Sequence, residues 1–226
     1  MCRFLLLKSP EKIDPQKFLS LFSEMSEKSK ALDGDWQGDG FGISWVDENN
    51  SWQEIKSTKP IWLTTDLFSK IPRTKLLSVH ARSATFKSQM QEGDTSYNQP
   101  YNNSEFSFVF NGHLKGVKLK RVVPGKIGAE KIWNLLLNEL EKNGMEDSLK
   151  NIDQFLTNHT EEIGAMNIGV ADKNNIYALC HYKPNDINPD YHNLWSMENA
   201  KLKMICSEPL QGFEMTKMKN LEIIKL

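Results

Sequence analysis

The order of strand-like and helix-like segments along the chain is the feature that most constrains its fold. Apolar residues recur at the helical period in two adjoining stretches, at 132, 133, 136 and 140 and again at 149, 152, 155 and 156. Strand-like segments precede these helices at 2–8, 41–46, 51–57, 76–81 and 106–110, and follow them at 166–171, 176–182, 194–197, 202–206 and 221–224. Because sheets and amphipathic helices must each bury an apolar face, this order predicts a layered α+β fold with sheets and helices packed face to face.

Local signals add detail near the N-terminus. Asp14 and Pro15 predict the start of another helix, whose apolar face would carry Phe18, Leu21, Phe22 and Met25. The turn 47–50 predicts a hairpin between the two strands that flank it. A long polar loop at 82–105 separates two strong strands, and such loops often carry function. We find no repeat and no flexible linker, so we expect a single domain over residues 1–226.

Composition excludes several classes of protein. Hydrophobic residues make up 39% of the chain and charged residues 25%, which is typical of a folded domain rather than a disordered one. The net charge is −1 and no basic stripe is present, so no nucleic-acid partner is expected. The apolar run at the N-terminus is too short for a signal peptide or a membrane span. Three widely spaced cysteines do not suggest a disulfide framework. Together with the short apolar run, this leads us to expect a cytoplasmic protein without membrane contact.

Cys2 follows Met1 directly and is the first candidate for chemistry. Methionine is normally trimmed before a small residue, and the mature Cys2 would then carry both a thiol and a free α-amine. A thiol with a pKa of about 8.5 is a weak nucleophile while protonated, whereas an α-amine with a pKa of about 7.7–8.0 can accept its proton. A base within the same residue would therefore suffice. Position alone is weak evidence, because a cysteine in second place is often incidental.

Four further segments follow Cys2 in a fixed order: 36–42 (WQGDGFG), 78–85 (SVHARSAT), 98–101 (NQPY) and 108–114 (FVFNGHL). Together with Cys2 they closely resemble the class II glutamine amidotransferases, especially the short stand-alone members that begin Met-Cys-Arg. The segment 206–210 (CSEPL) resembles the Ser-Glu-Pro-Leu segment of the same members. The resemblance spans nearly the whole chain. It implies a four-layer αββα sandwich of the N-terminal-nucleophile (Ntn) hydrolase type, and release of ammonia from a glutamine side chain.

The resemblance also implies a role for each matched residue. Cys2 would attack the amide carbon and form a thioester. Asn111, through its side-chain amide, and Gly112, through its backbone N–H, match the oxyanion hole, although Asn-Gly is equally a strong hairpin-turn signal. Arg82, helped by Thr85, matches the clamp on the substrate α-carboxylate, because a guanidinium fork fits a carboxylate bidentately. Taken alone, Arg82 would more readily be interpreted as part of a structural ion pair.

Other reactive side chains are interpreted as structural. His80 lies on a buried strand and is expected to be a hydrogen-bonded core residue, and Cys180 and Cys206 are expected to be buried thiols. Gly40 and Gly42 are expected to let backbone pass close to Cys2, with Asp39 fixing that turn. The five histidines show no metal-ligand spacing, so neither a metal nor another cofactor is predicted.

One segment departs from the family pattern. Where the family opens a helix with Thr-Asp-Ser-Glu, this chain has 127–130 (IGAE), followed by a helix expected over 131–141. Glu130 matches the family's glutamate, but Gly128 stands at the aspartate that receives the substrate's α-ammonium. Glycine cannot supply the carboxylate that an ammonium group needs. The departure leaves the chemistry at Cys2 intact and changes the expectation about the substrate.

Two hypotheses follow from the sequence. The first is an Ntn amidohydrolase acting on the γ-amide of glutamine or of a γ-glutamyl compound, which is a small-molecule substrate. Ammonia transfer would require a separate synthase subunit, and a peptidase subunit is the other partner considered, because stand-alone relatives act in glutathione breakdown and ergothioneine synthesis. The second is a catalytically degenerate amidotransferase fold that binds a metabolite or a partner protein. Gly128 favours the second hypothesis, whereas Cys2, Arg82 and Asn111 with Gly112 favour the first.

Overall fold

The computed structural model describes residues 1–28, 30, 34, 36–84, 93–183 and 188–226, which form two antiparallel sheets flanked by helices. The seven-stranded sheet has the order β11-β9-β10-β1-β4-β2-β3 and the five-stranded sheet the order β12-β8-β7-β6-β5. The strands of the first sheet are β1 (Arg3–Ile13), β2 (Phe41–Val46), β3 (Trp52–Ser57), β4 (Thr74–Ala81), β9 (Trp195–Glu198), β10 (Lys203–Cys206) and β11 (Thr216–Lys217). Those of the second are β5 (Tyr101–Asn102), β6 (Ser107–Lys115), β7 (Glu162–Ala171), β8 (Ile176–Cys180) and β12 (Glu222–Lys225).

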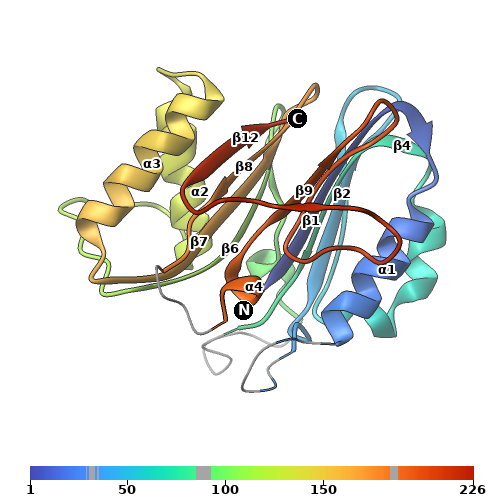
Figure 1. The fold of residues 1–226 in the computed structure, drawn as a ribbon, viewed down its shortest axis with the longest axis horizontal. Coiled ribbons are helices and arrows are strands. Elements are labelled where there is room, and N and C mark those ends of the chain that lie inside the picture. The colour runs from blue at the N-terminus through green and yellow to red at the C-terminus, as the bar shows by residue number, and fades with distance from the viewer. Residues whose placement is uncertain (29, 31–33, 35, 85–92, 184–187) are drawn as a thin grey trace.

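Helices cover the outer face of each sheet (Figure 1). The described helices are α1 (Gln16–Glu27), α2 (Gly128–Leu140), α3 (Met145–His159) and the short α4 (Pro189–His192), which lies at one end of the sheets, with 3₁₀ helices at Ile61–Leu63, Thr65–Lys70 and Thr95–Tyr97. The first sheet packs its outer face against α1, and the second packs its outer face against α2 and α3. The inner faces of the two sheets pack on each other. The result is the αββα sandwich that the resemblance implied.

β1 shows why the N-terminal apolar run is continuous. Phe4 and Leu6 face the second sheet, whereas Leu5 and Leu7 face the layer that contains α1. All four side chains are fully buried. A strand covered on both faces loses the usual polar alternation, and each such side chain contributes roughly 1.5–3 kcal/mol on burial. β1 is therefore fixed between β10 and β4, and Cys2 directly precedes it.

Two boundaries differ from the sequence expectation. The helix expected over 131–141 begins at Gly128, and the Glu130 carboxylate in its first turn accepts the backbone N–H of Lys126, which precedes the helix, at 2.6 Å. The strand expected over 106–110 extends to Lys115 and pairs with β7 over its whole length. The extension places Asn111 and Gly112 inside a strand, so their interpretation as a hairpin turn is wrong. The hairpin at 47–50 is confirmed, with β2 and β3 paired on either side of it.

The two chain ends lie at opposite ends of the sandwich. The N-terminus lies close to α4 at one end of the sheets, and the C-terminal strand β12 ends at the other (Figure 1). Among the described residues, no helix has both the length and the apolar character that crossing a membrane requires. Because Cys2 lies at the N-terminus, the sequence-predicted site residues are expected at this end of the sandwich.

Candidate active site

The position of Cys2 follows from the register of β1. Arg3 pairs with Ala81, so Cys2 faces the segment that follows β4. Its thiol lies against the backbone of Ser83, with Sγ 3.5 Å from the Ser83 nitrogen and 3.6 Å from the Ser83 oxygen. The structure thus joins two of the sequence motifs, the N-terminal cysteine and residues 78–85, at the end of the central strands.

The electrostatics of the thiol indicate that it needs a base. Although Cys2 as a residue is only half-buried, burial raises the pKa of its thiol above the ordinary value. The Ser83 backbone, the nearby amino terminus and the Arg82 and Arg3 guanidinium groups act in the opposite direction but do not cancel the rise. A thiol with a raised pKa stays protonated at neutral pH, so reaction requires a group that removes the proton.

The segment that contacts the thiol is held by the loop before β2. The Asp39 N–H donates to the Arg82 carbonyl at 3.0 Å, and the Arg82 N–H donates to the Gly40 carbonyl at 2.9 Å. The Asp39 carboxylate also accepts the Ala84 N–H at 2.7 Å. Asp39 therefore fixes residues 82–84, as the sequence suggested for a turn-fixing role, and through Ser83 it fixes the surroundings of Cys2.

Gly40 and Gly42 allow another segment to pack closely against their backbone, but that segment is not the one expected. Gly40 has φ +106°, and a Cβ there would lie 2.7 Å from the Asn98 side chain. A Cβ on Gly42 would overlap the Gln99 carbonyl oxygen. The neighbour that these glycines admit is thus the stretch Asn98–Gln99, which corrects the expectation that they accommodate Cys2.

The Arg82 guanidinium lies near enough to Cys2 to act on the pKa of its thiol, and part of its bonding capacity is unused. The residue is 7% exposed and its guanidinium carbon lies 5.4 Å from the centre of the Tyr97 ring. Its Nη1 is buried and, within the described residues, has no hydrogen-bond partner. The same part of the chain contains no ion pair of Arg82, so the structural ion-pair interpretation gains no support there. Thr85, the predicted helper of Arg82, lies outside the described residues.

Asn111 and Gly112 lie in β6, opposite Asn167 and Met166 of β7. Asn111 is fully buried, and its amide nitrogen lies 3.4 Å from the Ser207 hydroxyl. That hydroxyl also accepts the N–H of Phe4, two residues after Cys2, at 2.9 Å. A Cβ on Gly112 would overlap the Ala165 carbonyl oxygen, so only glycine fits. Ser207 therefore connects the Asn111 side chain with the start of β1.

A buried ion pair beside Cys2 was not anticipated from the sequence. The fully buried Arg3 donates from Nε to Glu208 at 2.8 Å and from Nη1 to the Cys2 carbonyl at 3.0 Å. Its guanidinium also lies 3.9 Å from the centre of the Tyr191 ring, and Lys30 contacts the second Glu208 oxygen at 2.8 Å. The signal that could have found the pair was the family-like segment 206–210, which sequence analysis matched without assigning it a role.

The remaining reactive groups are structural, as expected. His80 is fully buried with Nε2 3.2 Å from the Phe110 carbonyl, and burial lowers its pKa to about 3, so it is neutral. Burial raises the pKa of the Cys180 thiol and of the Cys206 thiol to about 12 each. Both cysteines are fully buried, whereas Cys2 is half-buried, so Cys2 has the most accessible position of the three.

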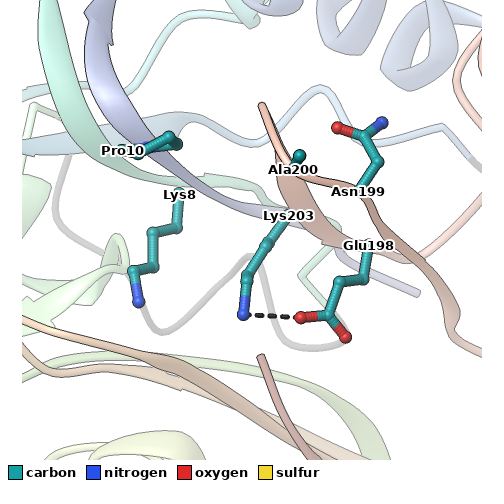
Figure 2. A pocket seen from close by; sticks show the side chains of 6 residues that line it. All are labelled: Lys8, Pro10, Glu198, Asn199, Ala200 and Lys203. Atoms are coloured by element: carbon teal, nitrogen blue, oxygen red, sulfur yellow. Dashed lines mark ion pairs between the residues drawn. The ribbon is translucent and has the colours of Figure 1, made fainter.

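A pocket of about 490 Å³ lies well away from this site (Figure 2). It is lined by Lys8, Pro10, Glu198, Asn199, Ala200 and Lys203. Lys203 is paired with Glu198 at 2.6 Å, and Lys8 extends beside Lys203. Lys8 is six residues beyond Cys2 on an extended strand, a separation of roughly 20 Å at 3.3–3.4 Å per residue. The pocket therefore plays no part in chemistry at Cys2.

Comparison with known proteins agrees with this geometry. Residues 1–211 match the family model of the class II glutamine amidotransferases. The chain belongs to this family. No curated protein matches this chain in sequence. Its fold is nonetheless shared with solved structures of low sequence identity.

Three such structures illustrate the shared fold. One is a glutamine aminotransferase class-II domain protein from Silicibacter pomeroyi, with a TM-score of 0.65, 14% identity, and coverage of 99% of this chain and 94% of that one. Another is the glutamine phosphoribosylpyrophosphate amidotransferase from B. subtilis, with a TM-score of 0.65, 14% identity, and coverage of 99% of this chain but 47% of that one. A predicted glutamine amidotransferase from Pseudomonas aeruginosa has a TM-score of 0.53, 14% identity, and coverage of 100% and 93%.

Proposed function

We propose that this amidotransferase hydrolyses the γ-amide of glutamine or of a γ-glutamyl compound, with Cys2 as the N-terminal nucleophile. The observation that carries the proposal is the position of the Cys2 thiol against the Ser83 backbone, adjacent to the buried and partly unpaired Arg82 guanidinium. A nucleophile and a carboxylate receptor on neighbouring backbone suit a substrate with an amide at one end and a carboxylate at the other.

The reaction begins with proton removal from Cys2. After Met1 is trimmed, the α-amine of Cys2 takes the thiol proton, directly or through a water, and the sulfur attacks the γ-amide carbon. The C–N bond of the resulting tetrahedral intermediate breaks, and the nitrogen leaves as ammonia or as an amine with the proton returned by the α-amine. Water then attacks the thioester, releasing the γ-carboxylate and regenerating the thiol. While Met1 remains, the Cys2 nitrogen is a peptide N–H and cannot act as the base.

The negative charge of each tetrahedral intermediate requires donors. We assign this role to the Asn111 side-chain amide and to the Gly112 N–H, which neighbour one another on β6. One such donor is typically worth about 2.7–4 kcal/mol. Arg82, with Thr85 as its helper, holds the α-carboxylate and so orients the amide toward Cys2. In this proposal residues 1–226 act as one amidotransferase domain, and any transfer of ammonia requires a synthase active site that accepts it.

An activity screen tests the proposal. Purified protein is incubated with glutamine, glutathione and other γ-glutamyl compounds, and release of ammonia or amine is measured alongside the intact mass. We expect turnover of at least one γ-glutamyl substrate by protein that has lost Met1. Retention of Met1 together with the absence of all turnover would instead support the non-catalytic binding protein, which the glycine at position 128 favours.

Replacing Arg82 by lysine tests the carboxylate clamp. Arg82→Lys keeps the charge but loses the planar fork, so kcat/KM should fall at least about tenfold, equivalent to roughly 1.4 kcal/mol. A substrate with an amidated α-carboxylate should be poor for the wild type and little affected by the change. Arg73→Lys is the matched control, because Arg73 is exposed and its hydrogen bonds within the described residues go to the Lys12 carbonyl. Wild-type rates for Arg82→Lys on every substrate would make Arg82 structural.

A further inference from the structure

Ser207 follows β10 directly and is fully buried beside the start of β1. Its backbone N–H donates to the Phe4 carbonyl at 3.0 Å, and its hydroxyl oxygen accepts the Phe4 N–H at 2.9 Å. The same hydroxyl lies 3.4 Å from the Asn111 amide nitrogen. Ser207 is thus held rigidly by β1 while its hydroxyl touches the proposed oxyanion donor.

Counting protons shows that this arrangement of the Asn111 amide leaves two groups unsatisfied. A serine hydroxyl has one proton to donate, yet Ser207 would only accept, from Phe4 and from Asn111. The Asn111 Oδ1 is buried and, among the described residues, has no partner. The oxygen and nitrogen of an amide are close to equal in shape, so which is which must follow from the hydrogen bonds.

Exchanging the two amide atoms gives the Ser207 proton and the Asn111 Oδ1 a partner each, and leaves the amide N–H group as the one without a protein partner in the described part of the chain. We propose that the Ser207 hydroxyl donates to the Asn111 Oδ1 and thereby orients the Asn111 Nδ2 as the free donor of the oxyanion hole. After the exchange, the amide N–H group occupies the buried position that the Oδ1 held and that has no protein partner. A buried donor with no protein acceptor is available to an anionic oxygen, and it needs no rearrangement when charge develops. This inference rests on the proposed function.

The next residue ties the nucleophile to the same backbone. Glu208 binds Arg3 at 2.8 Å, and Arg3 donates to the Cys2 carbonyl at 3.0 Å. Ser207 therefore contacts the proposed oxyanion donor, Asn111. Its neighbour Glu208 binds Arg3, which in turn binds the backbone of the nucleophile, Cys2. Ser207 is a positioning residue, because it acts on the substrate only through Asn111.

A double-mutant cycle on kcat tests this role. Asn111→Ala should lower kcat by about 10²–10³-fold, as loss of one oxyanion donor does. Ser207→Ala should lower kcat by roughly tenfold with KM unchanged, because the oxyanion exists only after attack. In the Asn111→Ala background, Ser207→Ala should have no further effect on kcat. Ser107→Ala is the control, since Ser107 is equally buried at the start of the same strand β6 and should leave kcat at the wild-type value.

The outcomes separate this inference from the proposed function. Three results would overturn the role of Ser207. Ser207→Ala could lower kcat as much in the Asn111→Ala background as in the wild type, it could leave kcat at the wild-type value, or it could change KM alone. Full activity of Asn111→Ala would instead remove the oxyanion assignment itself. Should Ser207→Ala fail to fold, Ser207→Cys carries the same cycle, because it preserves the shape while its S–H is a weak donor.

Discussion

Cys2→Ala abolishes amide hydrolysis and leaves the fold intact, according to the site geometry. The side chain precedes β1, and its described contacts are with the Ser83 backbone rather than with the apolar clusters between the layers. Removal of the sulfur therefore eliminates thioester formation but should cost no more than about 1 kcal/mol of folding free energy. Ammonia release and the thermal unfolding midpoint are the two measurements.

Cys180→Ala provides the matched control for this experiment. Cys180 lies fully buried in the cluster between the two sheets, so its truncation should lower the unfolding midpoint while turnover per folded molecule persists. The two variants are thus expected to show opposite patterns of activity and stability. Measurable turnover by Cys2→Ala would contradict the assignment of the nucleophile.

Free glutamine is expected to be a poor substrate of the wild-type protein. Gly128 is the first residue of α2, where the family aspartate that receives the α-ammonium would stand. A hydrogen bond to a charged group contributes about 1.5–3 kcal/mol, so its loss should weaken the handling of glutamine by roughly 10- to 150-fold. The preferred substrate would carry an uncharged α-nitrogen, or would be held mainly through the part beyond the γ-amide.

Gly128→Asp should then improve glutamine turnover. The position is exposed, and an added Cβ would meet no atom within 4 Å, so the structure has room for the side chain. A carboxylate in the first turn also suits the positive end of the helix dipole. We expect kcat/KM for glutamine to rise in Gly128→Asp, with N-acetylglutamine and glutathione as comparison substrates. Gly128→Asn, which has the same shape without the charge, should not reproduce the gain.

Efficient hydrolysis of glutamine by the wild type would contradict this expectation. It would mean that another carboxylate has taken over the ammonium. Glu130 is the nearest candidate along the chain, and its carboxylate already accepts the Lys126 N–H at 2.6 Å. Glu130→Gln would then lower glutamine turnover, whereas in our account it affects mainly the start of α2.

The layers were predictable because buried faces of helices and strands require apolar residues at regular spacings in the sequence. β2 was placed at its observed ends, since Phe41–Val46 is bounded by a glycine and a turn. The extension of β6 through Asn111 and Gly112 was not predictable, because its pairing with β7 over-rides the turn preference of that dipeptide. The start of α2 was placed too late because neither Ile127 at the N-cap nor Gly128 at the first position is a residue type that marks a helix start.

The site was predictable only in part, and family resemblance supplied most of it. Cys2 and Arg82 lie close together because Arg3 of β1 pairs with Ala81 of β4. No single sequence motif encodes this strand register. The Arg3 and Glu208 pair joins residues 205 positions apart, so the family-like segment 206–210 could point to Glu208 but no local pattern names Arg3 as its partner. Ser207 and Asn111 meet for the same reason, through the packing of two sheets.

Labelling with a glutamine-analogue diazo ketone tests the central claim most directly. The reagent places an electrophile at the position of the γ-amide, and the labelled residue is identified by mass measurement of the protein and its peptides. We predict one label per chain, on Cys2 of protein that has lost Met1, with none on Cys180 or Cys206, which are fully buried. Equal labelling of the three cysteines, or no label on Cys2 in a preparation that hydrolyses the amide, would contradict the account.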